Sequence, residues 1–296
     1  MRFNLLLADQ STDRLQELED VLRPLLFGLR AAGHTVCPGA QECKPPPMVN
    51  LAIEGFCDLD ADAIARARSK AGILFGVLCP TPPDALPPAR RDSLGALLAV
   101  SDFAWTVEGI ALPPDLFDPR QVASLVYGFD ERLVGRHLIT DPALRDLDVV
   151  IYGPEGARTD ALAARVVAMG LQQFSVRPGA LPDYLASDLL SRAKVVVVID
   201  ERLPPTGLTP RVVKAIYNGA AVVTEPGATT ADRFGQAVAY AAYDDLPARG
   251  RAVVVEGRYV ELGLTALDRL RTGVSMGDCA AAALRLPAFK HLLPEA

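Results

Sequence analysis

Short apolar runs alternate along the chain with longer segments in which apolar residues recur at helical spacing. Most of these runs are continuous rather than alternating, which is typical of strands buried on both faces of a sheet. In the first half, the pattern predicts helices over 12–32, 60–70 and 94–100. The strands are predicted at 3–8, 35–36, 49–53, 73–78, 103–107 and 123–126.

The same alternation starts again after residue 147. Helical segments are predicted at 160–169, 181–193 and 211–217, between runs at 148–152, 173–176, 194–200, 221–224, 236–240 and 252–256. Two successive strand–helix series predict an α/β protein with two doubly wound, Rossmann-like domains. We expect an N-terminal domain over 1–134, a linker over 135–147, a second domain over 148–263 and a tail over 264–296 that is helical from Leu264 to Leu286.

Composition narrows the class of protein. Half of the 296 residues are hydrophobic and the net charge is −6, which favours a folded chain and argues against a nucleic-acid partner. No leader peptide is evident, and the apolar runs are too short to span a bilayer. Five scattered cysteines without a CxxC pair indicate reduced thiols, and hence a cytoplasmic protein. The high content of Ala, Arg and Leu suggests a bacterial source.

The usual cofactor motifs are missing from the sequence. The first predicted strand is followed by ADQSTDR, which contains no glycine, and neither GxGxxG nor GxxxxGK[ST] occurs in the chain. A Rossmann-like domain needs such glycines to bring its backbone against a dinucleotide or nucleotide phosphate. We therefore expect no NAD, FAD or P-loop ATP chemistry and no bound cofactor.

A different pattern is present in the second half. VVIYGPEGARTDAL, with Gly153 and Arg158, and LLSRAKVVVVIDERLPPTGLTPRVVKAIYNGAAVVTE, with Arg211 and Gly219, resemble the carboxyl-terminal domain of GT-B glycosyltransferases. The resemblance is strongest to the family related to the spore-maturation protein CgeB. In the first half, NLAIEGF (50–56) and YGFDERLV (127–134) resemble the acceptor domain of that family. The resemblance implies a GT-B fold whose two domains face a central cleft, a nucleotide-sugar donor and an unidentified acceptor.

A nucleotide sugar needs its diphosphate neutralised as the glycosidic bond breaks. Without a metal, helix N-terminal amides and Arg or Lys side chains carry that task. We expect the amides of Gly207, Leu208 and Thr209, the Thr209 hydroxyl and the Arg211 guanidinium to bind the donor phosphates, with Arg158 reaching them from the opposite side. Alternatively, Thr209 only caps the helix, with Pro210 at its first position.

Lys214 is the main departure from the family pattern, because it stands where the family has a glutamate that binds ribose hydroxyls. A lysine only donates hydrogen bonds. Either Glu201 or Glu225 holds the ribose, or Lys214 binds a phosphate, or the donor site has drifted, or Lys214 simply lies on a solvated helix face. The resemblance also places the nucleotide base near Arg177 and Tyr184.

An inverting transferase needs a general base on the acceptor side. Glu54, at the end of the third predicted strand, is the first candidate and Asp9 the second. The alternative is that these are ordinary loop carboxylates. None of the histidines has a spacing that indicates a metal site. The predicted function is metal-independent glycosyl transfer, and the alternatives are an inactive GT-B-like binding or scaffold protein and a sugar-nucleotide epimerase.

Overall fold

The computed structural model describes residues 1–7, 19–40, 42–54, 59–135, 138–200, 208–290 and 292. Its contacts divide the chain into two compact units. The described residues of 1–14, 23–126 and 275–296 form the first unit, and those of 15–22 and 127–274 form the second. Each unit is built on one parallel sheet, so the expectation of two doubly wound α/β domains is confirmed.

The first sheet has the strand order β2-β1-β3-β4-β5-β6, and all of its pairings are parallel. The chain runs from β1 outward to β2 and then returns to pair β3 with the other side of β1. The topological switch point of this sheet therefore lies between β1 and β3. The strands are β1 (Arg2–Leu6), β2 (Thr35–Ala40), β3 (Met48–Ile53), β4 (Leu74–Cys79), β5 (Phe103–Val107) and β6 (Val122–Leu125).

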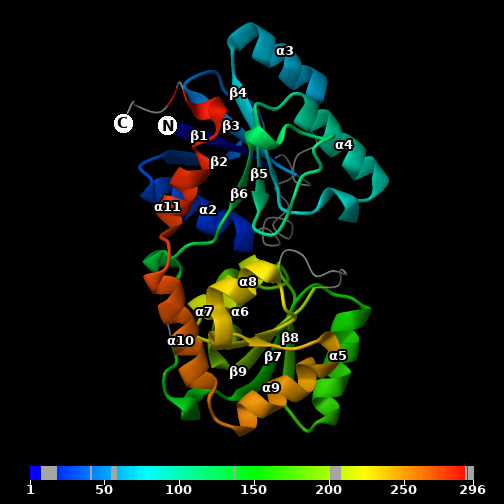
Figure 1. Ribbon diagram of the computed structural model, residues 1–296, viewed down its shortest axis with the longest axis vertical. Coiled ribbons are helices and arrows are strands. Elements are labelled where there is room, and N and C mark those ends of the chain that lie inside the picture. Colours follow the sequence, from blue (N-terminus) through cyan, green and yellow to red (C-terminus); the bar gives the residue numbers. More distant parts are fainter. Residues whose placement is uncertain are drawn as a thin grey trace. The chain divides into compact units, whose positions relative to one another are not determined.

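Among the described residues, the helices that belong with this sheet are α2 (Glu19–Ala31), α3 (Ala61–Ala71), α4 (Pro88–Ala99) and α11 (Met276–Ala283). Figure 1 draws α2 and α11 on one side of the sheet and α3 and α4 on the other. The α2 side has an aromatic core in which Trp105 packs against Phe3, Phe103 and Phe289, with ring centroids 5.4–6.2 Å apart. The first four residues of α2 count with the second unit.

The second sheet has the order β11-β10-β9-β7-β8, again with all pairings parallel. Its strands contain continuous runs of valine and isoleucine, such as Val149–Ile151 and Val195–Val198, as expected of strands covered on both faces. The chain goes from β7 to β8 and then returns to β9, so the switch point lies between β7 and β9. The strands are β7 (Leu147–Tyr152), β8 (Gln173–Val176), β9 (Ala193–Val198), β10 (Ala221–Thr224) and β11 (Ala239–Tyr240).

Helices cover both faces of the second sheet. Apolar residues of α5 (Ala157–Ala168) and α9 (Leu246–Val255) join one core with β7, β9 and β10. The helices α6 (Asp183–Arg192) and α7 (Leu208–Tyr217) contact β7, β9 and β10 as well. The unit also contains α8 (Ala228–Phe234) and α10 (Tyr259–Thr272). In the described part of both units, no helix is long and apolar enough to cross a membrane.

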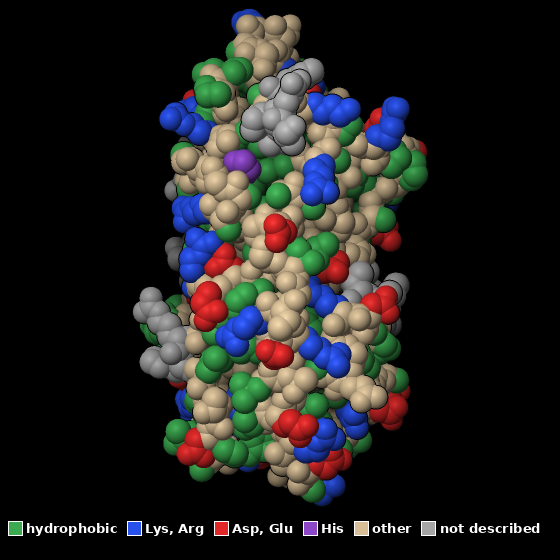
Figure 2. All heavy atoms as spheres, turned by 60° about the vertical axis from the view of Figure 1, so that its left-hand side comes forward, with side chains coloured by type: hydrophobic (Ala, Val, Ile, Leu, Met, Phe, Trp, Pro, Cys, Tyr) green, Lys and Arg blue, Asp and Glu red, His purple; other side chains and the backbone are tan. Residues whose placement is uncertain are grey.

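Single 3₁₀ turns complete the described secondary structure. They cover Pro83–Ala85, Pro119–Gln121, Glu131–Leu133, Pro142–Leu144, Gly235–Ala237, Tyr243–Asp245 and Pro287–Phe289. On the face drawn in Figure 2, basic and acidic side chains are interspersed.

Two sequence expectations need correction. The run at 252–256 is the end of helix α9, because Val253 is buried in the helix-covered core and packing overrides the strand preference of its valines. The tail expected to be one helix from Leu264 to Leu286 is two helices. Gly273 ends α10, and the Ser275 side chain starts α11 by accepting a hydrogen bond from the Asp278 amide at 3.0 Å.

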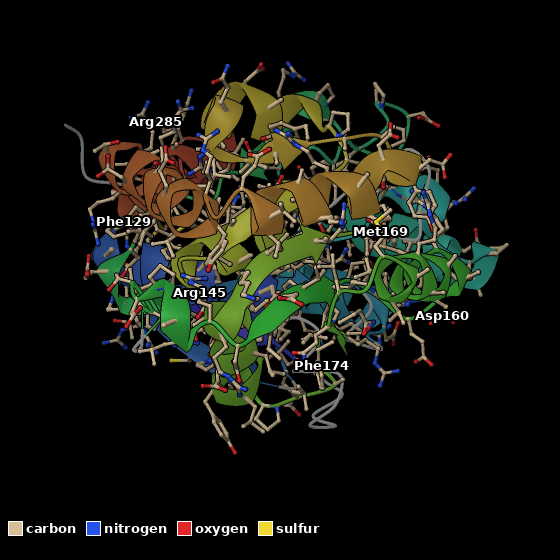
Figure 3. All side chains as sticks on the ribbon, turned by 90° about the horizontal axis from the view of Figure 1, so that it is seen from below. Phe129, Arg145, Asp160, Met169, Phe174 and Arg285 are labelled. Atoms are coloured by element: carbon tan, nitrogen blue, oxygen red, sulfur yellow. The ribbon has the colours of Figure 1, made fainter. Side chains whose placement is uncertain are left out.

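Arg145 holds together three parts of the second unit (Figure 3). Although only 2 % exposed, it makes no ion pair with the described residues and instead donates to backbone carbonyls. These are the oxygens of Ile139 at 2.8 Å, Ala193 at 2.6 Å and Gly219 at 2.8 Å. Burial lowers the pKa of the guanidinium, but not enough for it to lose its charge.

Buried thiols predict an alkaline loss of stability. Burial, with the nearby charge of Glu54, raises the pKa of Cys79 to about 12, whereas a thiol in an unfolded chain ionises near 8.5. The contribution of the neutral Cys79 thiol to the free energy of unfolding is fully present below the pKa of the thiol in the unfolded chain. It is lost as the pH rises towards the pKa of the thiol in the folded chain. We expect Cys79 alone to contribute a slope of about −1.4 kcal/mol per pH unit between pH 9 and 12.

Urea unfolding at several pH values between 8 and 11 measures this slope. The Cys79→Ala variant should show a shallower slope than the unmodified chain. Leu94→Ala, another core truncation but without an ionisable group, should lower stability while keeping the slope. Identical slopes for all three proteins would contradict the assignment.

Candidate functional site

The carboxyl ends of β7, β9 and β10 meet at the switch point of the second sheet, where ligands of open α/β sheets bind. Gly153, directly after β7, allows the close approach of these strand ends. A Cβ atom at this position would lie 2.7 Å from the Ile199 carbonyl oxygen and 2.5 Å from its Cγ2, closer than real Cβ contacts allow. The glycine in the sequence motif therefore has a steric reason.

Arg158, in the first turn of α5, reaches across these strand ends. Its Nη2 donates to both carboxylate oxygens of Glu225, at 3.0 and 2.9 Å, and its Nη1 donates to the Asp200 carbonyl. The guanidinium also lies 4.4 Å from the ring centre of Tyr243, whose hydroxyl donates to the Arg158 carbonyl at 2.7 Å. Arg158 is thus held in one orientation by the Asp200 carbonyl after β9 and the Glu225 side chain after β10.

Arg211, on α7, binds the neighbouring peptide group. Its Nη1 donates to the Ile199 carbonyl at 3.0 Å and lies 4.0 Å from Asp200 Oδ2. Two arginines therefore bind consecutive carbonyls at the end of β9. Within the described part of the chain, the hydrogen bonds of the Arg211 side chain use Nη1 alone, and the side chain is 20 % exposed. Its Nε and Nη2 donors are available to a ligand.

The N-terminus of α7 lies in the same chain segment. The helix begins at Leu208, so Thr209 lies inside its first turn. The capping interpretation had expected Thr209 to lie just before the helix. Thr209 is buried, and Gly207 and the Leu208 side chain lie outside the described residues. The first amides of a helix have no partner within it, so those of Leu208 and Thr209 are potential anion donors.

Lys214 does not lie on a solvated face. Its Nζ is 2.7 Å from Asp20 Oδ1 and 2.9 Å from Asp183 Oδ1, and its side chain is only 15 % exposed. Tyr152, at the end of β7, donates its hydroxyl to the second carboxylate oxygen of Asp20. We call these four residues the Lys214 cluster.

Charge in the Lys214 cluster is set by its own members. Burial alone would lower the pKa of Lys214, but Asp20 and Asp183 outweigh burial and raise it, so the amine stays cationic. Burial and the Asp20 charge raise the pKa of Tyr152 well above its usual value, so the phenol stays a neutral donor. The Lys214 amine already pairs with two carboxylates. Lys214 therefore differs in both chemistry and partners from the ribose-binding glutamate of the family that the sequence resembles.

The residues expected to hold the nucleotide base lie on the surface. Arg177 follows the edge strand β8 and forms an ion pair with Glu155, with both side chains more than half exposed. Tyr184 lies in the first turn of α6 and is 71 % exposed. No described hydrogen bond or ion pair joins either of them to Arg158 or Arg211, and their role in base binding stays a prediction.

Glu54 follows β3, at the switch point of the first sheet. It is 5 % exposed, its amide donates to the Leu78 carbonyl at 2.8 Å, and Arg90 Nη2 lies 3.7 Å from its Oε1. The position suits a site residue, but a buried carboxylate beside an arginine is also a structural anchor. Asp9, the other candidate base, lies outside the described residues.

Sequence reasoning did not single out Asp20, Asp183, Tyr152 or Asp200. Asp20 and Asp183 have no motif around them, and their partner Lys214 is remote in sequence, 194 residues away from Asp20. Asp200 had one available signal, since it ends an apolar strand next to the switch point. Among the described residues, no group of three or more His, Cys, Asp or Glu side chains is arranged to hold a metal ion.

No protein-family model and no curated protein sequence matches this chain. Solved structures match its fold. TarM superposes with a TM-score of 0.57 and 12% identity, over 82% of this chain and 55% of TarM. Sucrose-phosphate synthase from Thermosynechococcus elongatus gives 0.56 and 13%, over 99% of both chains. The apo structure of OtsA gives 0.54 and 9%, over 96% of this chain and 78% of OtsA.

These three matched proteins are GT-B glycosyltransferases. The chain spans little more than half the length of TarM but the whole length of the sucrose-phosphate synthase. At such low identities the likeness concerns the fold and not the activity. The two doubly wound units, the parallel strand orders and these superpositions together show that the chain has the GT-B fold.

Proposed function

We propose that this protein transfers a sugar from a nucleotide-sugar donor to an acceptor hydroxyl without a metal ion. The observation that carries the proposal is the pair of arginines, Arg158 and Arg211, on consecutive carbonyls at the switch point of the second sheet. In a GT-B fold, this arrangement places cationic donors and the first turn of α7 on the same strand end. The residues and their chemistry suit a diphosphate.

The two arginines have different tasks in this proposal. Arg158 is compensated by Glu225, to which it donates two hydrogen bonds, so it orders the strand ends. Arg211 has only a distant carboxylate partner, 4.0 Å away, and keeps two donor groups for the phosphate. Together with the amides of Leu208 and Thr209, and that of Gly207, it would stabilise the charge that develops on the leaving nucleotide.

Glu225 is the described candidate for the ribose hydroxyls, and Glu201, the other candidate, lies outside the described residues. Each carboxylate oxygen has two acceptor sites, and Arg158 occupies one on each. Lys214 remains in the proposal as a residue near the nucleotide sugar, because it lies on α7. Its amine is paired with Asp20 and Asp183. The proposal also places the nucleotide base near Arg177 and Tyr184. It gives the role of general base to Glu54 or Asp9. It further includes kinship with the CgeB-related family and a cytoplasmic location.

Thermal unfolding with UDP-, GDP-, dTDP- and CMP-sugars tests donor binding, with Mg²⁺ and with a chelator. A donor at about 100 times its dissociation constant should stabilise the chain by about 2.7 kcal/mol. Arg211→Gln should weaken binding by about 10- to 100-fold, because it removes a charge-assisted contact to phosphate. Arg249→Gln, an exposed arginine on α9, should bind as the unmodified chain does.

No stabilisation by any of these donors would overturn the proposal, as would equal binding by the Arg211→Gln variant. Binding that vanishes with the chelator would overturn metal independence alone. Incubation of a bound donor with candidate acceptors then measures transfer itself, and release of a changed sugar without any acceptor would indicate epimerisation.

One observation favours a second function, that of a non-catalytic GT-B-like binding protein. Lys214 stands at the position of the family's ribose-binding glutamate and is fully engaged with two carboxylates. Donor binding without turnover under any acceptor would support this function. Any sugar transfer by the unmodified chain would exclude it.

A further inference from the structure

A groove of about 620 Å³ opens on one face of the first sheet, over β1, β2 and β3. Side chains alternate between the two faces of a strand, and the parallel register sets Arg2 beside Thr35 and Met48, and Asn4 beside Cys37. These residues therefore share a face. The described lining is Arg2, Asn4, Thr35, Cys37, Lys44, Pro45, Pro46, Pro47 and Met48.

The groove exists because one crossover lacks a helix. The connection from β2 to β3 spans residues 41–47, and its described part, 42–47, forms no helix. Farther along the same face, Leu6, Ala52 and Phe75 are buried in a core with residues of α3 and α4. Parallel sheets are usually covered on both faces, so an open stretch beside this core is unusual.

The charges in the groove have one sign. Within the described part of the chain, neither the Arg2 guanidinium nor the Lys44 ammonium makes an ion pair or a hydrogen bond. No Asp or Glu is among the described lining residues. Two uncompensated cations in one concavity are notable in a chain whose net charge is −6.

Buried asparagines fix the wall that carries Lys44. Asn50, fully buried, accepts from the Lys44 amide at 2.7 Å and donates to the Lys44 carbonyl at 2.9 Å. Asn4, 1 % exposed, donates to Asn50 at 2.9 Å and to the Glu42 carbonyl at 3.0 Å. This network holds the backbone at Lys44 in place, which reduces the ordering cost of binding a ligand there.

We propose that this groove binds a small molecule carrying a carboxylate or phosphate group. Arg2 and Lys44 would bind the anion, the Thr35 hydroxyl would offer a further hydrogen bond, and the prolines and Met48 would contact an apolar part of the ligand. The volume falls within the range of small-molecule sites, about 300–1,000 Å³. The residues of this groove belong to the first unit and the arginine pair belongs to the second, and the proposal does not rest on the proposed transfer reaction.

The exposed thiol of Cys37 in the groove gives a direct readout. Its alkylation by neutral iodoacetamide is followed by fragment-resolved mass spectrometry with inorganic phosphate, with benzoate, with uncharged benzamide or with sodium chloride at matched ionic strength. We expect phosphate, benzoate or both to slow alkylation of Cys37 at least threefold, relative to sodium chloride. Benzamide should have no such effect.

The double variant Arg2→Gln/Lys44→Gln should lose this protection. Both side chains are exposed, and the contacts of Asn50 with Lys44 are to its backbone, so the fold should persist, as circular dichroism can check. Lys70→Gln removes an exposed cation of α3, outside the groove, and should keep the protection. Protection by phosphate alone identifies phosphate esters as the ligand class, and protection by benzoate alone identifies carboxylates.

The same alkylation rate with both anions as with sodium chloride would overturn the proposal. So would equal protection in the double variant, because the anion would then act elsewhere.

Discussion

Replacing Lys214 with methionine is expected to lower the free energy of unfolding by about 3–5 kcal/mol. The substitution keeps the length and apolar stem of the side chain but removes the cation from Asp20 and Asp183, whose carboxylates are 2.7 and 2.9 Å from its amine. The largely buried carboxylates of Asp20 and Asp183 then lose the positive charge of the Lys214 amine. Urea unfolding at pH 7, followed by circular dichroism, measures the loss.

A partial rescue separates this cause from simple loss of packing. In the triple variant Lys214→Met/Asp20→Asn/Asp183→Asn, the two carboxylate charges that Lys214 neutralised are gone, and much of the stability should return. Lys194→Met is the matched control. Among the described residues Lys194 forms an ion pair with one carboxylate, that of Asp148, and its side chain is more exposed than that of Lys214, so the substitution should cost about 1 kcal/mol. A loss below 1 kcal/mol in Lys214→Met would contradict the role assigned to the cluster.

Arg145→Met is expected to lower the free energy of unfolding by about 4 kcal/mol. Methionine fills much of the same volume but offers no donor to the carbonyls of Ile139, Ala193 and Gly219. Leaving a buried polar group unsatisfied costs about 1–3 kcal/mol each, and water that enters the site would recover part of this. Thermal or urea unfolding of the second unit, read by circular dichroism, tests the value.

Arg192→Gln is the control for Arg145→Met. Arg192 binds Asp146, the neighbour of Arg145 in sequence, but its side chain is 36 % exposed. We expect the control to cost less than about 1 kcal/mol. Equal effects of the two substitutions would show that the carbonyl contacts of Arg145 contribute nothing beyond a surface charge.

The sheets were predictable from sequence because their strands are continuous apolar runs. Ten of the twelve predicted runs appear as strands, and Val149 and Val195, at the centre of the second sheet, are fully buried. The run at 236–240 forms a strand only at Ala239–Tyr240, and the run at 252–256 lies in a helix. Valines favour strands on average, but burial against a neighbouring core decides the outcome at each position.

The break in the C-terminal tail was also available in the sequence. Ser275 and Asp278 have the three-residue spacing of a capping pair, and Gly273 precedes them. The apolar pattern alone continues across the break between α10 and α11. The single helix expected from Leu264 to Leu286 on that pattern was therefore too long.

The candidate site was predictable only in its motif residues. Gly153 and Arg158 follow a strand end closely in the sequence, and Arg211 lies in the helix motif between two strands. The structure places both arginines on the end of β9. The partners of Lys214 and Arg145 were not predictable. The former come from distant parts of the chain, and the latter are main-chain oxygens, which every residue has.

The return of residues 275–296 to the first unit has a consequence for synthesis on the ribosome. Phe289, fully buried, packs its ring 4.6 Å from that of Phe103 and is made after every residue of the second unit. The second unit can therefore complete its core first, while the first unit still lacks the Phe289 ring that packs against Phe103 and Trp105. Translation that stops short of Phe289 leaves the part of these rings that Phe289 covers without its packing partner, as a surface for chaperones or for aggregation.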